Sequence, residues 1–143
     1  MIRRLLFRRY VLIPIVLSPF LVLFFAPFNQ TAGSSPNSAR ILLQKARECK
    51  KELYQSKAKK KYRHNWQRCI KRYERVYRAF SGTDEGVHAL YGAARLWTFL
   101  YGYSGKNSDI DTAIALYREL VKRYTAHNLA DDAQYRLGEI FYR

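Results

Sequence analysis

The side chains that could do chemistry are few and scattered along the chain. Its three histidines are His64, His88 and His127, and none has a second His or a Glu at the spacing of a metal-binding motif. Zinc hydrolysis needs several such ligands converging on one ion. No acidic residue is paired with a plausible general base, and no glycine-rich phosphate loop is present. We therefore predict no catalytic residue, no metal and no cofactor, with surface or helix-capping roles for the histidines.

The two cysteines, Cys49 and Cys69, allow two interpretations. Both are equidistant in sequence from Lys59, which is the centre of an expected turn between two helices. In an antiparallel helical hairpin this places them at the same height, so a disulfide is geometrically reasonable if the domain reaches an oxidising compartment. The other interpretation is two small buried thiols, because the spacing does not establish that the side chains face each other.

Positive charge is concentrated in the middle of the chain. Residues 41–80 hold fourteen Lys and Arg against three Glu, whereas residues 81–143 hold seven basic and eight acidic side chains. Such a patch attracts anionic partners, which include lipid headgroups, nucleic acid and acidic polymers. A solvated basic face without a specific partner is the alternative. The candidate anion-binding residues are Lys59, Lys60, Lys61, Arg63, Arg68 and Arg72.

An apolar run near the N-terminus bears on the choice among these partners. Residues 10–28 contain no charged side chain and follow four arginines. As a helix the run would span roughly 28 Å, about the thickness of a hydrocarbon core. It is either an uncleaved anchor, weakened by three prolines, or a cleaved export signal, and a buried core helix is the third interpretation. The basic end stays in the cytoplasm, so the remainder would be exported.

The location of the basic patch beyond this run favours lipid headgroups over nucleic acid. The interleaved aromatic residues Tyr62 and Trp66 would suit nucleic acid as stacking platforms, but export makes that partner improbable. We assign residues 1–28 to a signal peptide or membrane anchor, residues 29–38 to a linker and residues 39–143 to a helical domain. The expected location is the bacterial inner membrane, with the domain in the periplasm, or the periplasm alone after cleavage.

The helical domain repeats itself at an offset of 44 residues. The segment Cys69-Ile70-x-x-Tyr73 aligns with Ala113-Ile114-x-x-Tyr117, and Ala89-x-Tyr91 aligns with Ala133-x-Tyr135 at the same offset. A period of this size with helical spacing inside it is typical of stacked helix pairs, which bind partners on extended surfaces. Tyr91, Arg95 and Tyr135 are the candidate partner-binding residues, because they could face a concave groove.

Hydrophobic spacing places the expected helices at residues 39–56, 62–80, 85–101 and 108–124, and from residue 128 onward. A lysine-rich turn at 57–61 and a loop at 102–107 separate them, and Ser108 with Asp111 resembles a capping box. The second helix should turn its apolar stripe inward (Trp66, Cys69, Ile70, Tyr73, Val76, Tyr77, Phe80). Small residues should allow helices to approach closely (Cys69, Ala94, Ala113, Gly138), and large aromatics should fill the spaces between pairs (Tyr73, Trp97, Tyr117, Phe141).

The segment Ala113…Tyr117…Leu120 with Leu137-Gly138…Phe141 resembles the tetratricopeptide pattern, although the period of 44 exceeds that family's usual 34. Within that superfamily, Lys61-Tyr62-Arg63-His64-Asn65-Trp66-x-x-Cys69-Ile70-x-Arg72-Tyr73 and Ala130-Asp131-Asp132-Ala133-Gln134-Tyr135 define a narrower likeness. It is similar to the repeat region ahead of the catalytic domain in exported bacterial N-acetylmuramoyl-L-alanine amidases. The resemblance implies a periplasmic module that positions a peptidoglycan hydrolase.

We therefore expect an all-α fold: a tetratricopeptide-like solenoid of two helical hairpins plus a capping helix, preceded by an N-terminal hydrophobic helix. The expected function is a non-catalytic protein-interaction module of the cell envelope, because no catalytic domain of the resembled family lies within the chain. One alternative is that the chain is a fragment of a full zinc-dependent amidase. The other is a basic nucleic-acid-binding protein, which a cytosolic location would favour.

Overall fold

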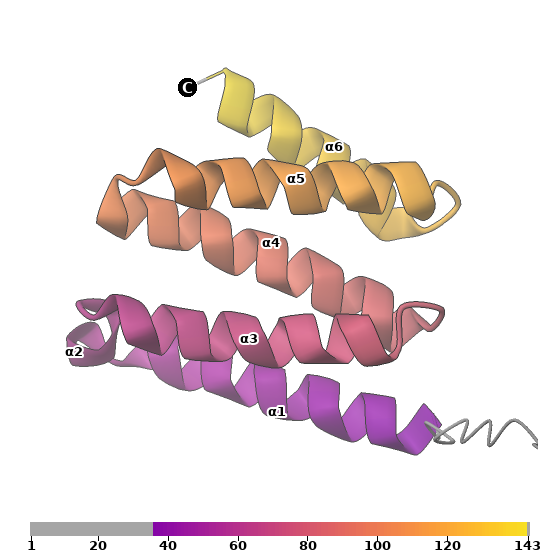
Figure 1. Ribbon diagram of the computed structural model, residues 1–143, viewed down its shortest axis with the longest axis horizontal. Coiled ribbons are helices and arrows are strands. Elements are labelled where there is room, and N and C mark those ends of the chain that lie inside the picture. Colours follow the sequence, from indigo (N-terminus) through magenta and orange to yellow (C-terminus); the bar gives the residue numbers. More distant parts are fainter. Residues whose placement is uncertain (1–35, 143) are drawn as a thin grey trace, which may run out of the picture. The chain divides into compact units, whose positions relative to one another are not determined.

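The computed structural model describes residues 36–142, and within that range the protein consists of helices without a β-strand (Figure 1). The predicted all-α class is confirmed. The apolar run and most of the expected linker lie outside the described residues. Among the described helices, none has the length and apolar character needed to cross a membrane. The helices are α1 (Pro36–Gln55), α2 (Lys57–Lys60), α3 (Arg63–Ala79), α4 (Asp84–Ser104), α5 (Asn107–Arg123) and α6 (Asn128–Phe141).

The five longer helices form a layered stack in which each runs opposite to the one before it (Figure 1). Consecutive helices pack together, from α1 on α3 through to α5 on α6, and α4 also contacts both α1 and α6. The helices α1, α4 and α6 are therefore neighbours on one side of the stack. A pocket lies between α4 and α6.

Two clusters of buried side chains hold the stack together, and α4 contributes to both of them. The first joins α1, α3 and α4 around Trp66 and Tyr73, and the second joins α4, α5 and α6 around Tyr117. The apolar stripe predicted for the second helix is confirmed: its members are buried, with Tyr77 half-buried. Burial of these large side chains is the main favourable term in folding.

Close helix approach is achieved by some of the predicted small residues and not by others. Cys69, Ala94 and Ala113 are almost fully buried, as expected. Gly138 does not sit at a close approach, because a Cβ added there would meet nothing within 4 Å. Gly92 has that role instead, since a Cβ would lie 2.5 Å from Cε1 of Tyr73. The expected filling role of Phe141 is also wrong, because this side chain is 62% exposed.

Several helix ends differ from the sequence-based expectation. The lysine-rich segment is not only a turn: it contains the single-turn helix α2, and Lys59 N–H donates to the Ser56 hydroxyl over 3.1 Å. Helix α1 begins at Pro36, inside the expected linker and three residues before the expected helix start at residue 39. Proline suits a first helical position because its missing N–H would be unpaired there.

The connection between α4 and α5 is shorter than the expected loop at residues 102–107. Helix α4 continues to Ser104 and ends at Gly105, whose φ of 61° is the left-handed conformation that glycine adopts most easily. The predicted capping box at Ser108 is wrong, because α5 begins at Asn107 with Lys106 as its N-cap residue. Helix α6 begins at Asn128 as expected, with His127 as its N-cap.

Candidate functional site

A cavity of about 240 Å³ lies between α4 and α6. Helix α4 lines it with Arg95, Phe99 and Tyr103, which follow one another at intervals of four and so share a face. Helix α6 lines it with Arg136, Glu139 and Ile140, which share a face because the second and third lie three and four residues after the first. We call this space the α4–α6 pocket. It combines an apolar wall with charged groups, as binding sites for small ligands or single side chains do.

Tyr117 of α5 also lines the α4–α6 pocket, and its hydroxyl lacks a hydrogen bond within the described part of the chain. The residue is 1% exposed, and its hydroxyl has no hydrogen-bond partner among the described residues. The hydroxyl of Thr98, which also lines the pocket, lies near the Tyr117 hydroxyl and acts to lower the pKa of that phenol, but the two form no hydrogen bond of normal geometry, and Thr98 donates to the carbonyl of Ala94 over 3.1 Å. Burial raises the pKa of Tyr117 to about 12, so the phenol remains a donor at neutral pH. An unpaired buried hydroxyl is costly, and an acceptor in the pocket would remove that cost.

Two arginines make the α4–α6 pocket electropositive. Arg95 lies over the rings of Tyr91 and Phe99, 6.0 and 5.7 Å from their centroids, and forms no ion pair with another described residue. Arg136 donates to Glu139 over 2.6 Å, and its contacts with Tyr91 and Glu139 raise its pKa further. Glu139 therefore neutralises one guanidinium and leaves the other without a counter-ion in the pocket.

The three residues predicted to face a groove are only partly brought together. Tyr91 and Arg95 lie side by side, and the Tyr91 ring meets that of Tyr117 edge-on at 5.9 Å. Tyr135 does not line the pocket: it is 65% exposed, and Arg136 stacks over it at 5.7 Å. Arg136 and Glu139 were not among the predicted site residues. Their helical spacing in the last repeat was the available signal.

The outer face of α3 forms a second candidate surface. Arg68, Lys71, Arg72 and Arg75 outline an open hollow of about 470 Å³, together with His64 and Gln67. We call these four cations the basic face. Two of the predicted anion-binding residues, Arg68 and Arg72, belong to it, and Arg72 also donates to the carbonyl of Lys45 over 3.3 Å. Lys71 and Arg75, which were not predicted, each lie three residues after one of these two and so share their helix face.

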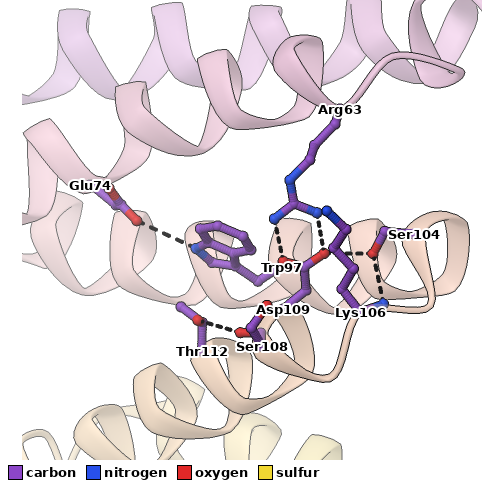
Figure 2. A network of polar contacts seen from close by, with 8 residues as sticks. All are labelled: Arg63, Glu74, Trp97, Ser104, Lys106, Ser108, Asp109 and Thr112. Atoms are coloured by element: carbon purple, nitrogen blue, oxygen red, sulfur yellow. Dashed lines mark hydrogen bonds and ion pairs between the residues drawn. The ribbon is translucent and has the colours of Figure 1, made fainter.

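The remaining predicted anion-binding residues have other partners or positions. Arg63 is directed to α5, where its guanidinium is occupied by the carboxylate of Asp109 (Figure 2). The ammonium of Lys59 lies 3.2 Å from Glu52, and the carbonyl of Lys60 accepts from the Trp66 ring N–H at 2.8 Å. Lys61 is exposed. Because Trp66 is almost fully buried, it cannot serve as the stacking platform that nucleic acid would need.

Asp84, His88 and His127 are the candidate metal-binding group, with ligand atoms within 4.8 Å of one another. This group was not predicted, because His127 precedes α6 and lies about forty residues from Asp84 and His88 of α4. The Nδ1 atom of His127 accepts from Leu129 N–H over 3.1 Å, and Nε2 lies 2.9 Å from Asp84. A neutral ring that accepts at Nδ1 carries its proton on Nε2 and donates it to the carboxylate. A metal bound at Nε2 would leave the ring proton on Nδ1, which could then no longer accept from Leu129 N–H. The geometry therefore favours the predicted capping role for His127.

Cys49 of α1 and Cys69 of α3 form a disulfide, with their Cα atoms 5.5 Å apart. Both residues are buried in the first core cluster, so the bond lies inside the α1–α3 packing interface. Disulfides persist in oxidising compartments and are rare where thiols are kept reduced. Of the two interpretations left open by the sequence, the structure has the disulfide.

No family model, curated protein or solved structure matches this chain. Function is therefore inferred from the geometry of the described residues. Three features bear on it: the electropositive α4–α6 pocket with its unpaired hydroxyl, the basic face of α3, and the buried disulfide.

Proposed function

We propose that this chain is a non-catalytic, tetratricopeptide-like interaction module of the bacterial cell envelope that positions peptidoglycan-remodelling machinery. The observation that carries the proposal is the α4–α6 pocket, in which the Tyr117 hydroxyl has no hydrogen-bond partner and the Arg95 guanidinium has ring contacts but no counter-ion among the described residues. Buried polar groups in proteins are normally hydrogen-bonded. Donors left unpaired in a pocket on one side of a helical stack therefore favour a binding role.

The tetratricopeptide-like arrangement is supported by equivalent residues in successive units. Tyr73 and Tyr117, which are aligned by the repeat, are both buried with unpaired hydroxyls. Polar contacts also join residues about one repeat apart: the Tyr124 hydroxyl donates to the carbonyl of Ser81 over 2.7 Å, and His127 lies 2.9 Å from Asp84. Contacts between residues about one repeat apart support a solenoid, in which each unit packs on the next.

The envelope location is supported by the disulfide and by the sequence that precedes the described residues. A buried disulfide suits an exported domain, and the arginine-led apolar run at residues 1–28 is typical of an export signal or anchor. The link to peptidoglycan rests on the resemblance of residues 39–143 to the repeat region of exported amidases. A catalytic role is not proposed, because the described residues bring together no nucleophile, base and substrate pocket.

Photo-crosslinking in living bacteria tests this proposal. A benzoylphenylalanine placed at Phe99, at the mouth of the α4–α6 pocket, should capture peptidoglycan hydrolases or synthases of the envelope. The same group placed at Tyr62, which is exposed on a different part of the stack, is the matched control and should not capture them. Adducts at Phe99 with cytosolic proteins only, or the same adducts from both positions, would contradict the proposal.

The basic face favours a second, auxiliary contact with anionic lipid headgroups. Its four cations lie on one helix face and form no ion pair with a described acidic residue. Each cation near an anionic membrane contributes about 1 kcal/mol of attraction. Replacing Arg68, Lys71, Arg72 and Arg75 by Gln should weaken binding of the full chain to phosphatidylglycerol vesicles but not to phosphatidylcholine vesicles. Because both proteins share the N-terminal run, the difference between them reports the basic face alone. Equal binding to both vesicle types would exclude this contact.

A further inference from the structure

The α4–α6 pocket has a ligand preference that deepens the proposed function and rests on it. We propose that the pocket seats a side-chain carboxylate of an acidic, extended segment of a partner protein. The bound carboxylate would accept from the Tyr117 hydroxyl and the Arg95 guanidinium.

The groups without partners in the pocket are donors. The Tyr117 hydroxyl is buried and unpaired, and Arg95 is held only by ring contacts with Tyr91 and Phe99. The one acidic group in the pocket, Glu139, is already bound by Arg136. An added acceptor is therefore needed, and a donor ligand would find no free acceptor of comparable strength. The uncompensated guanidinium selects a carboxylate over a neutral carbonyl, because hydrogen bonds between ionised partners are stronger.

The pocket is the size of a single side chain. Its volume of about 240 Å³ falls below the range of roughly 300–1,000 Å³ that holds drug-sized ligands. Phe99 and Ile140 provide an apolar wall along which the methylene groups of a glutamate could pack, while Arg95 lies next to Phe99. A side chain entering from an extended segment satisfies these limits. Because the Tyr117 hydroxyl oxygen is shielded from solvent in the unbound protein, the carboxylate must displace the side chains that cover it to reach this donor.

The charges around the pocket extend beyond one carboxylate. Burial lowers the pKa of Lys50 of α1, and the nearby charges of Arg95 and Arg47 lower it further. These three cations belong to α1 and α4, which are neighbours in the stack. Arg136 of α6 continues the same electropositive side. A segment with several acidic residues would follow these cations from α6 to α1, whereas a single isolated acid would meet only one of them.

A peptide pair tests the chemistry directly. The probe is N-acetyl-Glu-Gly-Glu-(4-fluoro-Phe)-Glu-amide, and its control has Gln in place of every Glu. Both are titrated against the full chain in a non-ionic detergent at fixed ionic strength, and binding is followed by fluorine NMR of the probe. The acidic peptide should bind at least about tenfold more tightly than the Gln peptide, which corresponds to one charge-assisted contact or more.

Paired variants locate the carboxylate within the protein. Tyr117→Phe removes only the unpaired hydroxyl and should weaken the acidic peptide roughly three- to tenfold, the worth of one hydrogen bond. Tyr73→Phe is the matched control, because it removes the equivalent unpaired hydroxyl outside the pocket and should change nothing. Arg95→Gln should weaken binding about tenfold or more, whereas Arg75→Gln on the basic face should leave it within about twofold.

Three outcomes would overturn the inference. They are equal binding of the two peptides, unchanged binding by Tyr117→Phe, and an effect of Arg75→Gln as large as that of Arg95→Gln. Tyr117→Phe keeps the residue's volume, so the test survives even if Arg95→Gln fails to fold, which circular dichroism would reveal. These measurements do not depend on cellular location. The carboxylate subsite can therefore fail while export and crosslinking still support the proposed function, and the reverse also holds.

Discussion

Arg63 of α3 and Asp109 of α5 form a bidentate ion pair, with both N–O distances at 2.5 Å, although 46 residues separate them in sequence (Figure 2). Asp109 is 1% exposed, and the Ser104 hydroxyl donates to the same carboxylate over 2.6 Å. At the other end of α3, Tyr77 donates to Glu119 of α5 and accepts from Arg123. Polar contacts therefore fix both ends of α3 against α5, and so hold successive helix pairs in register.

Removing Arg63 should be strongly destabilising because it leaves a buried carboxylate without its counter-ion. We expect Arg63→Gln to lower the free energy of unfolding by about 3–5 kcal/mol. Urea unfolding followed by circular dichroism measures it. The matched control is Arg68→Gln on the same helix, where the side chain is exposed and the effect should stay within about 0.5 kcal/mol. Similar losses in both variants would show that the ion pair contributes no more than a surface charge.

Stability should fall in acid because two carboxylates are stabilised in the folded state. The hydrogen bond from Arg63 holds the pKa of Asp109 below its ordinary value, and the hydrogen bond from His127 does the same for Asp84. A carboxyl group with a depressed folded-state pKa contributes stability above its unfolded pKa of about 3.9 and loses it as the pH falls.

Unfolding measured between about pH 6 and pH 2 checks this dependence. The unmodified protein should lose stability progressively below about pH 4–5, and Asp109→Asn should show a shallower loss because position 109 no longer titrates. The variant will be less stable at neutral pH, so the comparison concerns the slope rather than the level. Parallel curves for the two proteins would mean that Asp109 is not the group responsible.

Breaking the disulfide should reduce stability without changing the fold. Cys49 and Cys69 are 20 residues apart. Closing a loop of that size stabilises the folded state by about 3 kcal/mol, because it lowers the conformational entropy of the unfolded chain. Dithiothreitol should therefore lower the free energy of unfolding of the unmodified protein by about that amount. The Cys49→Ala/Cys69→Ala variant should be insensitive to the reductant. An equal response of both proteins would assign the effect to the reagent and not to the bond.

Two glycines on different helices should respond oppositely to alanine. At Gly92 an added Cβ lies 2.5 Å from the Tyr73 ring, so Gly92→Ala should destabilise by about 1–3 kcal/mol through overpacking. At Gly138 an added Cβ meets nothing within 4 Å, so Gly138→Ala should stabilise α6 by up to about 1 kcal/mol, the difference in helix propensity. Thermal unfolding of the two variants measures both effects. Changes in stability of the same sign in both variants would contradict the close approach at Gly92 and the open space at Gly138.

The helical class and the inward stripes could be predicted because they depend on local periodicity. Trp66, Ile70 and Tyr73 recur at helical spacing, and this spacing alone determines which face of α3 is apolar. The errors at Gly138 and Phe141 have one cause. Their repeat equivalents, Ala94 and Trp97, are covered by the following helix α5, whereas no helix follows α6 among the described residues. The repeat alignment carried over the residue type but not the neighbour that buries it.

The candidate site was less predictable because it depends on contacts between distant segments. Arg95 was identified from its own helix, but its proposed role requires Arg136 and Tyr117, which reach the same space only once α4, α5 and α6 are packed. Arg63 was assigned to the basic surface by its position in a lysine-rich segment. Its partner, Asp109, lies a full repeat away, and no local pattern in the sequence indicates such a pair.

The proposed envelope function requires the folded helices to lie outside the cytoplasm, and a reporter fusion tests this most directly. A phosphatase that is active only after export would be joined after Arg143 in a bacterial host, and a galactosidase that is active only in the cytoplasm would be joined at the same position as its control. We predict an active phosphatase and an inactive galactosidase. An inactive phosphatase, stably expressed, together with an active galactosidase would contradict the envelope function.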